Sequence, residues 1–532
     1  MNASVLVPLP VVLPLFGAGL ALALGRSARA QRMVSVVVLT LVVGVAAVLL
    51  ARADADGPQV MHVGGWPAPI GISLVADRLS ALMLLVSVVV ALCVMLYSLS
   101  QGLVEYGPDT PLSIYHPTFL ILVAGVSNAF LSGDLFNLYV GFEVLLAASY
   151  VLLTLGGTAD RIRAGSTYVV VSLASSIVFL TALALVYAAT GTVSLAQLAG
   201  RLDDLPSGVA LMLQLMLLTA FAIKAAVFPL SAWLPDSYPT APAPVTAVFA
   251  GLLTKVGVYA IIRTQTLLFP DSPLSDLLLW AALLTMVIGI LGAVAQDDLK
   301  RMLSFTLVSH IGYMVFGVAL ASDDGLSGAI YYVVHHIVIQ TNLFLVAGLI
   351  ERRGGSTSLE RLGGLARLSP VLALLFFVPA MNLAGIPPFS GFLGKLGLMQ
   401  AGVDNGSSLA YVLVAGSVVT SLLTLYAMAK AWNRAFWQPP LPETDEEAEA
   451  VANGATTDLH GKPVRTDTRR VSGKVATVAL RAGMAGPAAV LLVVGVALTV
   501  FAGPLFGLTD RAAADLRERT PYIEAVLPGG AP

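Results

Sequence analysis

Residues 217–228 read LLTAFAIKAAVF, an apolar stretch that holds one lysine, Lys224, near its centre. Residues 136–146 read FNLYVGFEVLL and place Glu143 in a similar setting. Lys255 and Lys395 also lie inside apolar stretches that are long enough to cross a bilayer. A charge at the bilayer centre costs roughly 2.5–3.5 kcal/mol on insertion scales. The sequence therefore predicts a membrane protein whose buried charges face one another or water, as in an ion or proton path.

The composition supports a chain that crosses the membrane many times. Of its 532 residues, 57% are hydrophobic and 11% are charged, whereas a soluble domain is about 25% charged. We count about fourteen candidate spans, which predicts an all-α polytopic membrane protein. The net charge of -2 argues against nucleic-acid binding. The single cysteine, Cys93, excludes disulfides and cysteine-ligated iron–sulfur clusters within the chain.

The distribution of basic residues predicts the orientation of these spans. Loops on one side carry 18 lysines and arginines, and loops on the other side carry 7. The positive-inside rule then places both termini outside, which suits an even number of spans. We expect a multi-pass protein of a bacterial-type cytoplasmic membrane whose first apolar segment is retained.

One short motif that contains proline occurs twice, and its two copies lie about five spans apart. Residues 228–234 read FPLSAWL, and residues 387–393 read PPFSGFL. An odd number of spans per repeat gives the two copies opposite orientations, so we expect two inverted five-helix repeats. Proline interrupts helices, which predicts breaks at Pro229 in one span and at Pro387 and Pro388 in the span over 368–403. Lys224 lies about one turn before the first break, and Lys395 lies about two turns after the second.

Glu143, Lys224 and Lys255 are the first candidates for the path. A nearby carboxylate stabilises the charged form of a buried lysine, so movement of Glu143 relative to Lys224 could load or release a proton. The structural alternative is a static ion pair between two helices. Lys255 lies between small residues that allow close helix packing, and its structural alternative is a lysine that extends to the membrane surface.

Histidines and other polar residues supply the remaining candidates. His335 and His336 are adjacent and point to different helix faces, so we expect one of them to line the path and leave open which; either could instead be a bonded core residue. Lys395 is a candidate for the end of the path. His310 is a candidate for a structural cap or for a residue at which protons enter the path. Asp134 is a candidate for a helix N-cap or for a carboxylate that attracts cations. Asp236 is a candidate for a loop or cap residue, or for one at which protons enter. No second ligand stands at metal-binding spacing from the histidines, so no metal site is expected.

Several motifs resemble one known family. They are residues 132–150 around Glu143, Lys224 through Asp236, residues 299–313 around His310, and residues 385–395. These stretches resemble the antiporter-like subunits, which include the proton-pumping membrane subunits of respiratory complex I and the large subunits of Mrp-type cation/proton antiporters. The sequence of residues 134–143 is most similar to that of the D subunits of Mrp antiporters. The resemblance covers roughly the third to the thirteenth span.

The resemblance implies fourteen spans, with spans 4–8 and 9–13 as inverted repeats. It implies a central charged axis made of Glu143 in span 5, Lys224 in broken span 7, Lys255 in span 8, His335 or His336 in span 11 and Lys395 in broken span 12. The expected parts are spans 1–3 (1–100), the first repeat (101–265), the second repeat (266–435), a polar cytoplasmic insert (436–482), span 14 (483–508) and a C-terminal tail (509–532).

We therefore expect a subunit of a multisubunit antiporter that exchanges Na⁺, or else Li⁺ or K⁺, for protons. Its partners would be the other subunits and the lipid bilayer. No nucleotide-binding or haem motif is present, so we expect no cofactor and no enzymatic activity. The main alternative is a proton-pumping subunit of a respiratory NADH:quinone oxidoreductase or a related hydrogenase complex. A scaffold subunit without transport and a stand-alone transporter of organic solutes are further alternatives.

Overall fold

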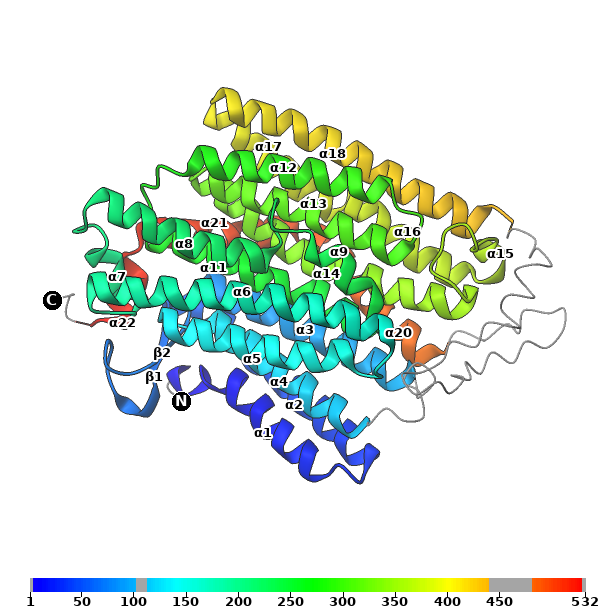
Figure 1. Ribbon diagram of the computed structural model, residues 1–532, viewed down its shortest axis with the longest axis horizontal. Helices are drawn as coiled ribbons and strands as arrows, with labels where there is room; N and C mark the ends of the chain where they lie inside the picture. The colour runs from blue at the N-terminus through cyan, green and yellow to red at the C-terminus, as the bar shows by residue number, and fades with distance from the viewer. Residues whose placement is uncertain (1–2, 102–111, 440–480, 529–532) are drawn as a thin grey trace.

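The computed structural model describes residues 3–101, 112–439 and 481–528. The polar insert expected at 436–482 therefore lies almost entirely outside the described residues. The described chain is mainly helical, and its long helices run side by side along one axis (Figure 1). The predicted all-α polytopic fold is confirmed.

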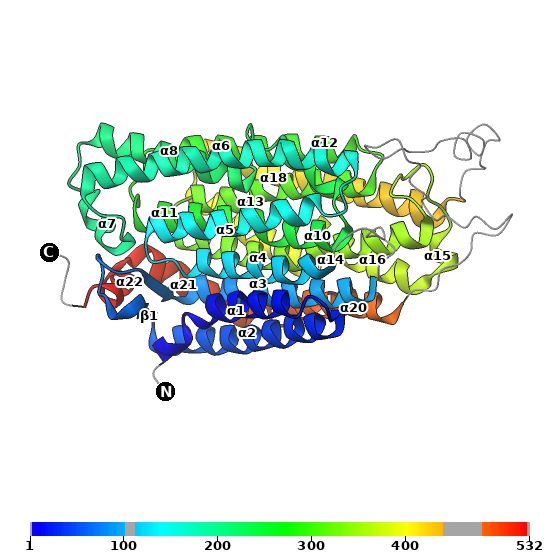
Figure 2. The same ribbon diagram turned by 60° about the horizontal axis from the view of Figure 1, so that its bottom comes forward.

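The N-terminal part forms one flank of the bundle. Figure 2 shows its first two long helices side by side along the lower edge, next to the following helices. A β-hairpin lies between the second and third helices at one end of the bundle. The elements are η1 (Ala3–Leu6), α1 (Leu9–Ala23), α2 (Ala28–Asp56), β1 (Gln59–His62), η2 (Val63–Gly65), β2 (Ser73–Ala76) and α3 (Arg78–Gln101).

The next part contains the first predicted helix break. Its elements are α4 (Leu112–Leu131), α5 (Leu135–Thr154), α6 (Ala159–Thr190), α7 (Leu195–Arg201), α8 (Ser207–Ala225), α9 (Trp233–Ser237), η3 (Tyr238–Thr240), α10 (Ala243–Val248), η4 (Phe249–Leu253) and α11 (Thr254–Leu267). Helix α8 ends a few residues before the proline of the break, Pro229. The indole Nε1 of Trp233 donates to the carbonyl of Ile223 at 3.1 Å, so a carbonyl near the break has a partner, as it must at membrane depth.

The following part contains the second predicted break. Its elements are α12 (Ser275–Val294), α13 (Leu299–Ala319), α14 (Asp323–Gly354), α15 (Leu365–Leu368), α16 (Pro370–Ala384), α17 (Ser390–Asn405), α18 (Ser408–Trp432) and η5 (Asn433–Trp437). Gly385 ends α16 in the left-handed region, at φ 84°. Pro387 and Pro388 then separate α16 from α17, so the span expected at 368–403 consists of two short helices.

The C-terminal part differs from the expected single span followed by a tail. It forms α20 (Ala482–Val500), α21 (Ala502–Glu518) and α22 (Thr520–Val526). Helix α21 starts directly after α20 and continues along the bundle (Figure 1). The expected boundary at residue 508 therefore lies inside a helix, and the tail expected at 509–532 is helical over most of its described length.

Length and composition identify 13 helices of the described ranges as candidate membrane spans. The broken pair α16 and α17 supplies the remaining crossing of the fourteen we expected. Helix α14 lies at the centre, and every residue of its most apolar window is buried. The windows of α6 and α12 are each 39% buried, and their exposed Val170, Ile177 and Leu291 face outward, as expected for contact with lipid.

One local structure occurs twice and supports the repeat. Asp134 caps α5 and pairs with Ser194 in an isolated bridge, and Asp298 caps α13 and pairs with Ser358 in the same way. The first bridge lies beside α7 and the second beside α15, at opposite ends of the bundle (Figure 1). Opposite ends are what an inverted repeat requires. The boundaries between the repeats stay a prediction.

Candidate functional site

Glu143 and Lys224 are joined by a serine that sequence analysis did not select. Glu143 lies on α5, Lys224 lies in the last turn of α8, and Ser176 lies on α6 between them. The hydroxyl of Ser176 donates to Oε1 of Glu143, and Nζ of Lys224 donates to the same hydroxyl at 3.3 Å. The lysine is 7% exposed. A change of charge on either group is therefore transmitted to the other through one hydroxyl.

The surroundings of Lys224 combine an aromatic ring with a small cavity. Its Nζ lies 5.0 Å from the centre of the Phe142 ring, a contact that stabilises a cation. A cavity of about 20 Å³ is lined by Lys224, by Ser172 and Ser175, and by Leu253 of η4. That volume holds one water molecule. The cavity therefore connects the lysine of α8 with the element that precedes Lys255.

Lys255 lies directly after a π-helical segment, η4. Wide π turns alter the backbone hydrogen-bond pattern and occur often at functional sites. Nζ of Lys255 donates to the carbonyl of Ala250 in this segment at 2.6 Å. The side chain is completely buried, so it does not extend to the surface as the structural alternative required.

Gly257 allows the helix of Lys255 to approach the helix of Lys224. A Cβ at this position would lie 2.7 Å from the amide nitrogen of Ala225 and 3.0 Å from the carbonyl carbon of Lys224. Any larger residue would push α11 away from α8. The glycine therefore brings the two lysine-bearing helices into backbone contact next to Lys224.

His310 and His336 form the next group, at the centre of the bundle. Both are fully buried, and their ring centres are 5.2 Å apart. Helix α11, which carries Lys255, packs against the helices of both rings, α13 and α14. His310 Nδ1 shares a 2.9 Å hydrogen bond with the hydroxyl of Tyr332. Neither ring nitrogen of His336 has a hydrogen-bond partner within the described part of the chain, so this histidine is available to exchange protons with a neighbour or with water.

His335 points to the second helix break. Its Nδ1 shares a 3.0 Å hydrogen bond with Ser390 at the start of α17. Ser390 in turn bonds Oδ1 of Asn382 on α16 at 3.3 Å. The ring of His335 lies 5.4 Å from that of Tyr332. The sequence left open which adjacent histidine lines the path, and the structure directs His336 to the centre and His335 to the break.

Lys395 binds the carbonyls that the break leaves without helical partners. Its Nζ donates to Leu383 and Ala384 at 3.2 Å each, and these residues form the end of α16. Nζ also lies 5.0 Å from the ring centre of Tyr313. The negative end of a helix and an aromatic face both stabilise an ammonium group, so the break forms a cation-stabilising site, and no carboxylate of the described residues pairs with Lys395.

The other candidates lie in different environments. Asp134 is the N-cap of α5, as predicted, because its Oδ1 accepts from the amide of Asn137 at 2.6 Å; Oδ2 has no partner among the described residues. Burial raises the pKa of Asp134 to about 6. Asp236 is exposed and forms a 2.9 Å ion pair with Arg301 at the start of α13. His310 is central, far from the surface position that a cap or an uptake residue implies.

The groups that sequence analysis missed are mainly hydroxyls. Ser176 lies inside an apolar helix, where a serine hydroxyl can bond to its own backbone and so gives no clear signal. Tyr313 and Tyr332 also lie inside apolar helices, where a tyrosine is equally consistent with core packing. Neighbouring serines at 172, 175 and 176 could have indicated a polar face on this helix. The π-helical segment before Lys255 has no comparable mark in the sequence.

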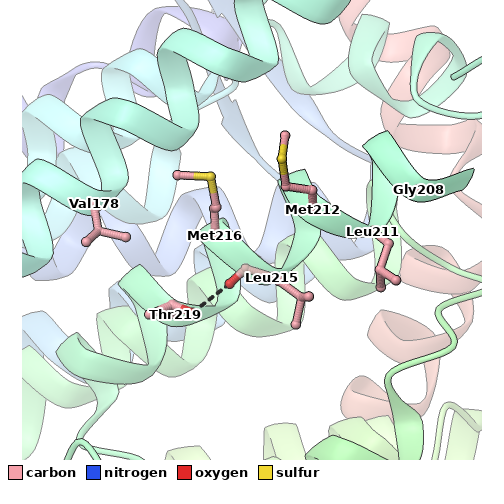
Figure 3. A pocket seen from close by; sticks show the side chains of 7 residues that line it. All are labelled: Val178, Gly208, Leu211, Met212, Leu215, Met216 and Thr219. Atoms are coloured by element: carbon pink, nitrogen blue, oxygen red, sulfur yellow. Dashed lines mark hydrogen bonds between the residues drawn. The ribbon is translucent and has the colours of Figure 1, made fainter. Parts of the chain in front are cut away.

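A separate hollow on the outside of the bundle has a different character. It measures about 370 Å³ and is lined by Val178 of α6 and by apolar residues of α8. Figure 3 shows Thr219 at its edge with its hydroxyl bonded to the carbonyl of Leu215 at 2.7 Å. The lining carries no ionisable side chain, so this hollow adds no support to the alternative of a stand-alone transporter of organic solutes.

A buried series of carboxylate, lysine and histidine side chains inside a bundle of membrane-spanning helices defines a polytopic protein of the ion-translocating type. The family model described as "NADH:quinone oxidoreductase/Mrp antiporter, TM" matches residues 132–424. The chain belongs to this family. The matched region contains every residue of the series from Glu143 to Lys395.

The chain is similar along its whole length to known members of the family. It is 37% identical over 525 residues to a protein of Alkalihalophilus pseudofirmus that is named as the D-type subunit of a Na(+)/H(+) antiporter, covering 98% of this chain and 99% of the relative. It matches a chain of the Mrp complex from a Dietzia species with 35% identity and a TM-score of 0.88, covering 99% of each. A chain of respiratory complex I from Thermus thermophilus matches with 25% identity and a TM-score of 0.77, covering 96% of this chain and 99% of that one.

Proposed function

We propose that this protein is one component of a multisubunit Na⁺/H⁺ antiporter and that it carries protons along the buried series from Glu143 to Lys395. The observation that carries the proposal is the series itself, in which ionisable groups follow one another from the first helix break to the second. We take Na⁺ as the exchanged cation because the Alkalihalophilus relative is named as a subunit of a Na(+)/H(+) antiporter. If both termini lie outside, as the basic residues predict, the end of the bundle that carries the termini faces outward and the opposite end faces the cytoplasm.

The contacts suggest how a proton passes through the first half. Glu143 stabilises the ammonium form of Lys224 through Ser176. When Glu143 is protonated or turns away, that support is lost, and Lys224 can release its proton. The cavity beside Lys224 has room for one water molecule to accept it. Lys255 is the next group that can take up the proton, because it follows the segment that lines this cavity.

The second half continues the transfer through aromatic and imidazole groups. The helix of Lys255 packs against the helices of His310 and His336, and a hydrogen bond connects His310 to Tyr332. His335 and Lys395 then both contact the break between α16 and α17, His335 through Ser390 and Lys395 through the last carbonyls of α16. Imidazole changes its charge near neutral pH in water, which suits it to relay protons. Lys395 is the last lysine of the series, and the carbonyls of Leu383 and Ala384 accept hydrogen bonds from its Nζ.

The main alternative, a proton-pumping component of a respiratory complex, has the weaker support. The complex I chain is 25% identical to this protein, against 37% and 35% for the antiporter relatives. The two alternatives predict different neighbours. Purification of the intact assembly with small antiporter subunits supports the proposal, and purification with quinone-binding and iron–sulfur subunits overturns it.

The proposal is tested by proton exchange in membrane vesicles that contain the complete complex. Sodium or potassium is added to energised vesicles, and proton movement is recorded for the wild type and for Lys224→Ala. We expect sodium-driven exchange in the wild type and its loss in the variant, with normal assembly of the complex. Exchange at the wild-type rate in the variant would make Lys224 a structural residue and would favour a scaffold role for this protein.

A further inference from the structure

The junction between α20 and α21 lies against the second helix break. The amide of Ser390, at the start of α17, donates to Oγ1 of Thr499 at 2.9 Å. The hydroxyl of Tyr331 on α14 donates to the carbonyl of Leu498 at 3.2 Å. Helix α20 ends directly after Thr499, at Val500. Two interrupted helices therefore meet at the level where His335 and Lys395 lie.

A row of polar residues on α14 leads away from this junction. His335, Tyr331 and Ser327 are spaced four residues apart, so they lie on one face of the helix. Nε2 of His335 has no hydrogen-bond partner within the described residues. Adjacent members of the row are about 6 Å apart along the helix axis. The row runs from the centre of the bundle toward the start of α14, the end at which the C-terminal helices lie.

Helix α21 completes this row at the end of the bundle. Oγ of Ser327 lies 2.8 Å from Oγ1 of Thr509, and it donates to Oδ1 of Asp510. Thr509 is buried and Asp510 is exposed. Arg517 of the same helix pairs with Asp323 at the start of α14 at 3.1 Å, which fixes α21 along this part of α14. The row thus ends in a carboxylate that solvent can reach.

An aromatic stack closes the row at its middle. The ring of Phe506 on α21 lies parallel to the ring of Tyr331, with 4.1 Å between centres and 5° between planes. Phe506 is partly exposed, and Tyr331 is fully buried. The Phe506 ring covers one face of the Tyr331 ring, so rotation of the Phe506 side chain would uncover that face beside the row.

We propose that α14 and the C-terminal helices α20 and α21 form the outlet of the proton path, with Asp510 as its terminal proton acceptor and the Tyr331–Phe506 stack as its gate. The inference rests on the proposed function. The proton leaves the end of the series at His335 and Lys395 by way of His335, water and the hydroxyls of Tyr331 and Ser327, each hydroxyl accepting one proton and giving up another. Asp510 then transfers the proton to solvent. The C-terminal segment is therefore a working part of the path.

The test uses the complete complex in vesicles with the end bearing α22 facing outward. Asp510→Asn keeps the shape of the side chain and removes its proton-accepting carboxylate. The control is Asp324→Asn, an acidic residue in the first turn of α14 at the same end. We expect Asp510→Asn to slow sodium-driven exchange roughly 100-fold, at the lower end of what a positioned proton-transfer group contributes. Asp510→Glu and the control should stay near the wild-type rate.

Two further measurements separate this role from a structural one. A membrane-impermeant buffer at high concentration outside should restore exchange in Asp510→Asn, because a mobile base can replace an exposed carboxylate. Phe506→Ala should increase proton leak in the absence of sodium. Wild-type exchange in Asp510→Asn, or a slow variant that the buffer does not restore, would overturn the outlet while leaving the proposed function intact. Failure of the proposed function appears separately, as absence of sodium-driven exchange in the wild type.

Discussion

Replacement of Ser176 by alanine tests the connection between Glu143 and Lys224. The serine hydroxyl donates to Glu143 and accepts from Lys224 at 3.3 Å. A hydrogen bond to a charged group contributes about 1.5–3 kcal/mol, and about 1.4 kcal/mol corresponds to a factor of ten. If one such bond supports the proton-loaded state, its loss lowers the rate of sodium-driven exchange roughly 10- to 150-fold.

The neighbouring residue Ser175 provides a matched control for this substitution. It is also buried on the same helix, but its hydroxyl donates to the carbonyl of Ala220 at 3.0 Å and bonds to neither charge. Exchange is measured in vesicles with the complete complex, together with the amount of assembled complex. We expect Ser176→Ala to be slow and Ser175→Ala to be slowed far less, because Ser175 lines the cavity beside Lys224 but bonds neither charge. Equal rates for the two variants would refute a role for the serine in coupling the two charges.

Two further predictions concern packing and stability. Gly257→Ala should lower the thermal unfolding temperature of the purified complex and slow exchange, because the new Cβ would lie 2.7 Å from the amide nitrogen of Ala225 and such overpacking costs about 1–3 kcal/mol. Val193→Thr should stabilise the protein. Val193 occupies the position that Thr357 has in the second bridge, where the Thr357 hydroxyl donates to Oδ2 of Asp298. Oδ2 of Asp134 has no such partner among the described residues. Since the folded pKa of Asp134 is about 6, above its usual 3.8, the wild type loses stability as pH rises through this range. The gain, roughly 1.5–3 kcal/mol, should therefore appear in unfolding curves at pH 7 and vanish near pH 4; an equal gain at both values would contradict this account.

The charged candidates of the site could be selected from the sequence for a physical reason. A lysine or glutamate inside an apolar span is energetically costly and therefore rare. Each of these four residues could be recognised individually: Glu143, Lys224, Lys255 and Lys395. The breaks were visible because proline interrupts a helix. Family membership and the helical structure confirm the predicted class of fold, whereas the path through these residues stays a prediction.

The partners of these charges could not be read from the sequence. A serine in an apolar helix costs little, so Ser176 looked the same as its neighbours. Adjacent histidines face different directions, and only the packing of α13 and α17 around α14 shows that His336 meets His310 while His335 meets Ser390. The sequence predicted only a C-terminal tail after residue 508, and it did not show that α21 packs against α14 by way of Thr509 and Asp510.

The most direct test of the buried path is the exchange activity of Lys255→Met in the complete complex. Lys255 joins the two halves of the series, and its side-chain hydrogen bond among the described residues is to Ala250, so methionine removes the charge with little change in shape. Lys430→Met is the control, because Lys430 lies at the end of α18 and pairs with Asp297 at 2.9 Å, away from the series. The account predicts that sodium-driven exchange disappears in Lys255→Met and persists in Lys430→Met, with both complexes assembled. Exchange at the wild-type rate in Lys255→Met would contradict a proton path through this residue.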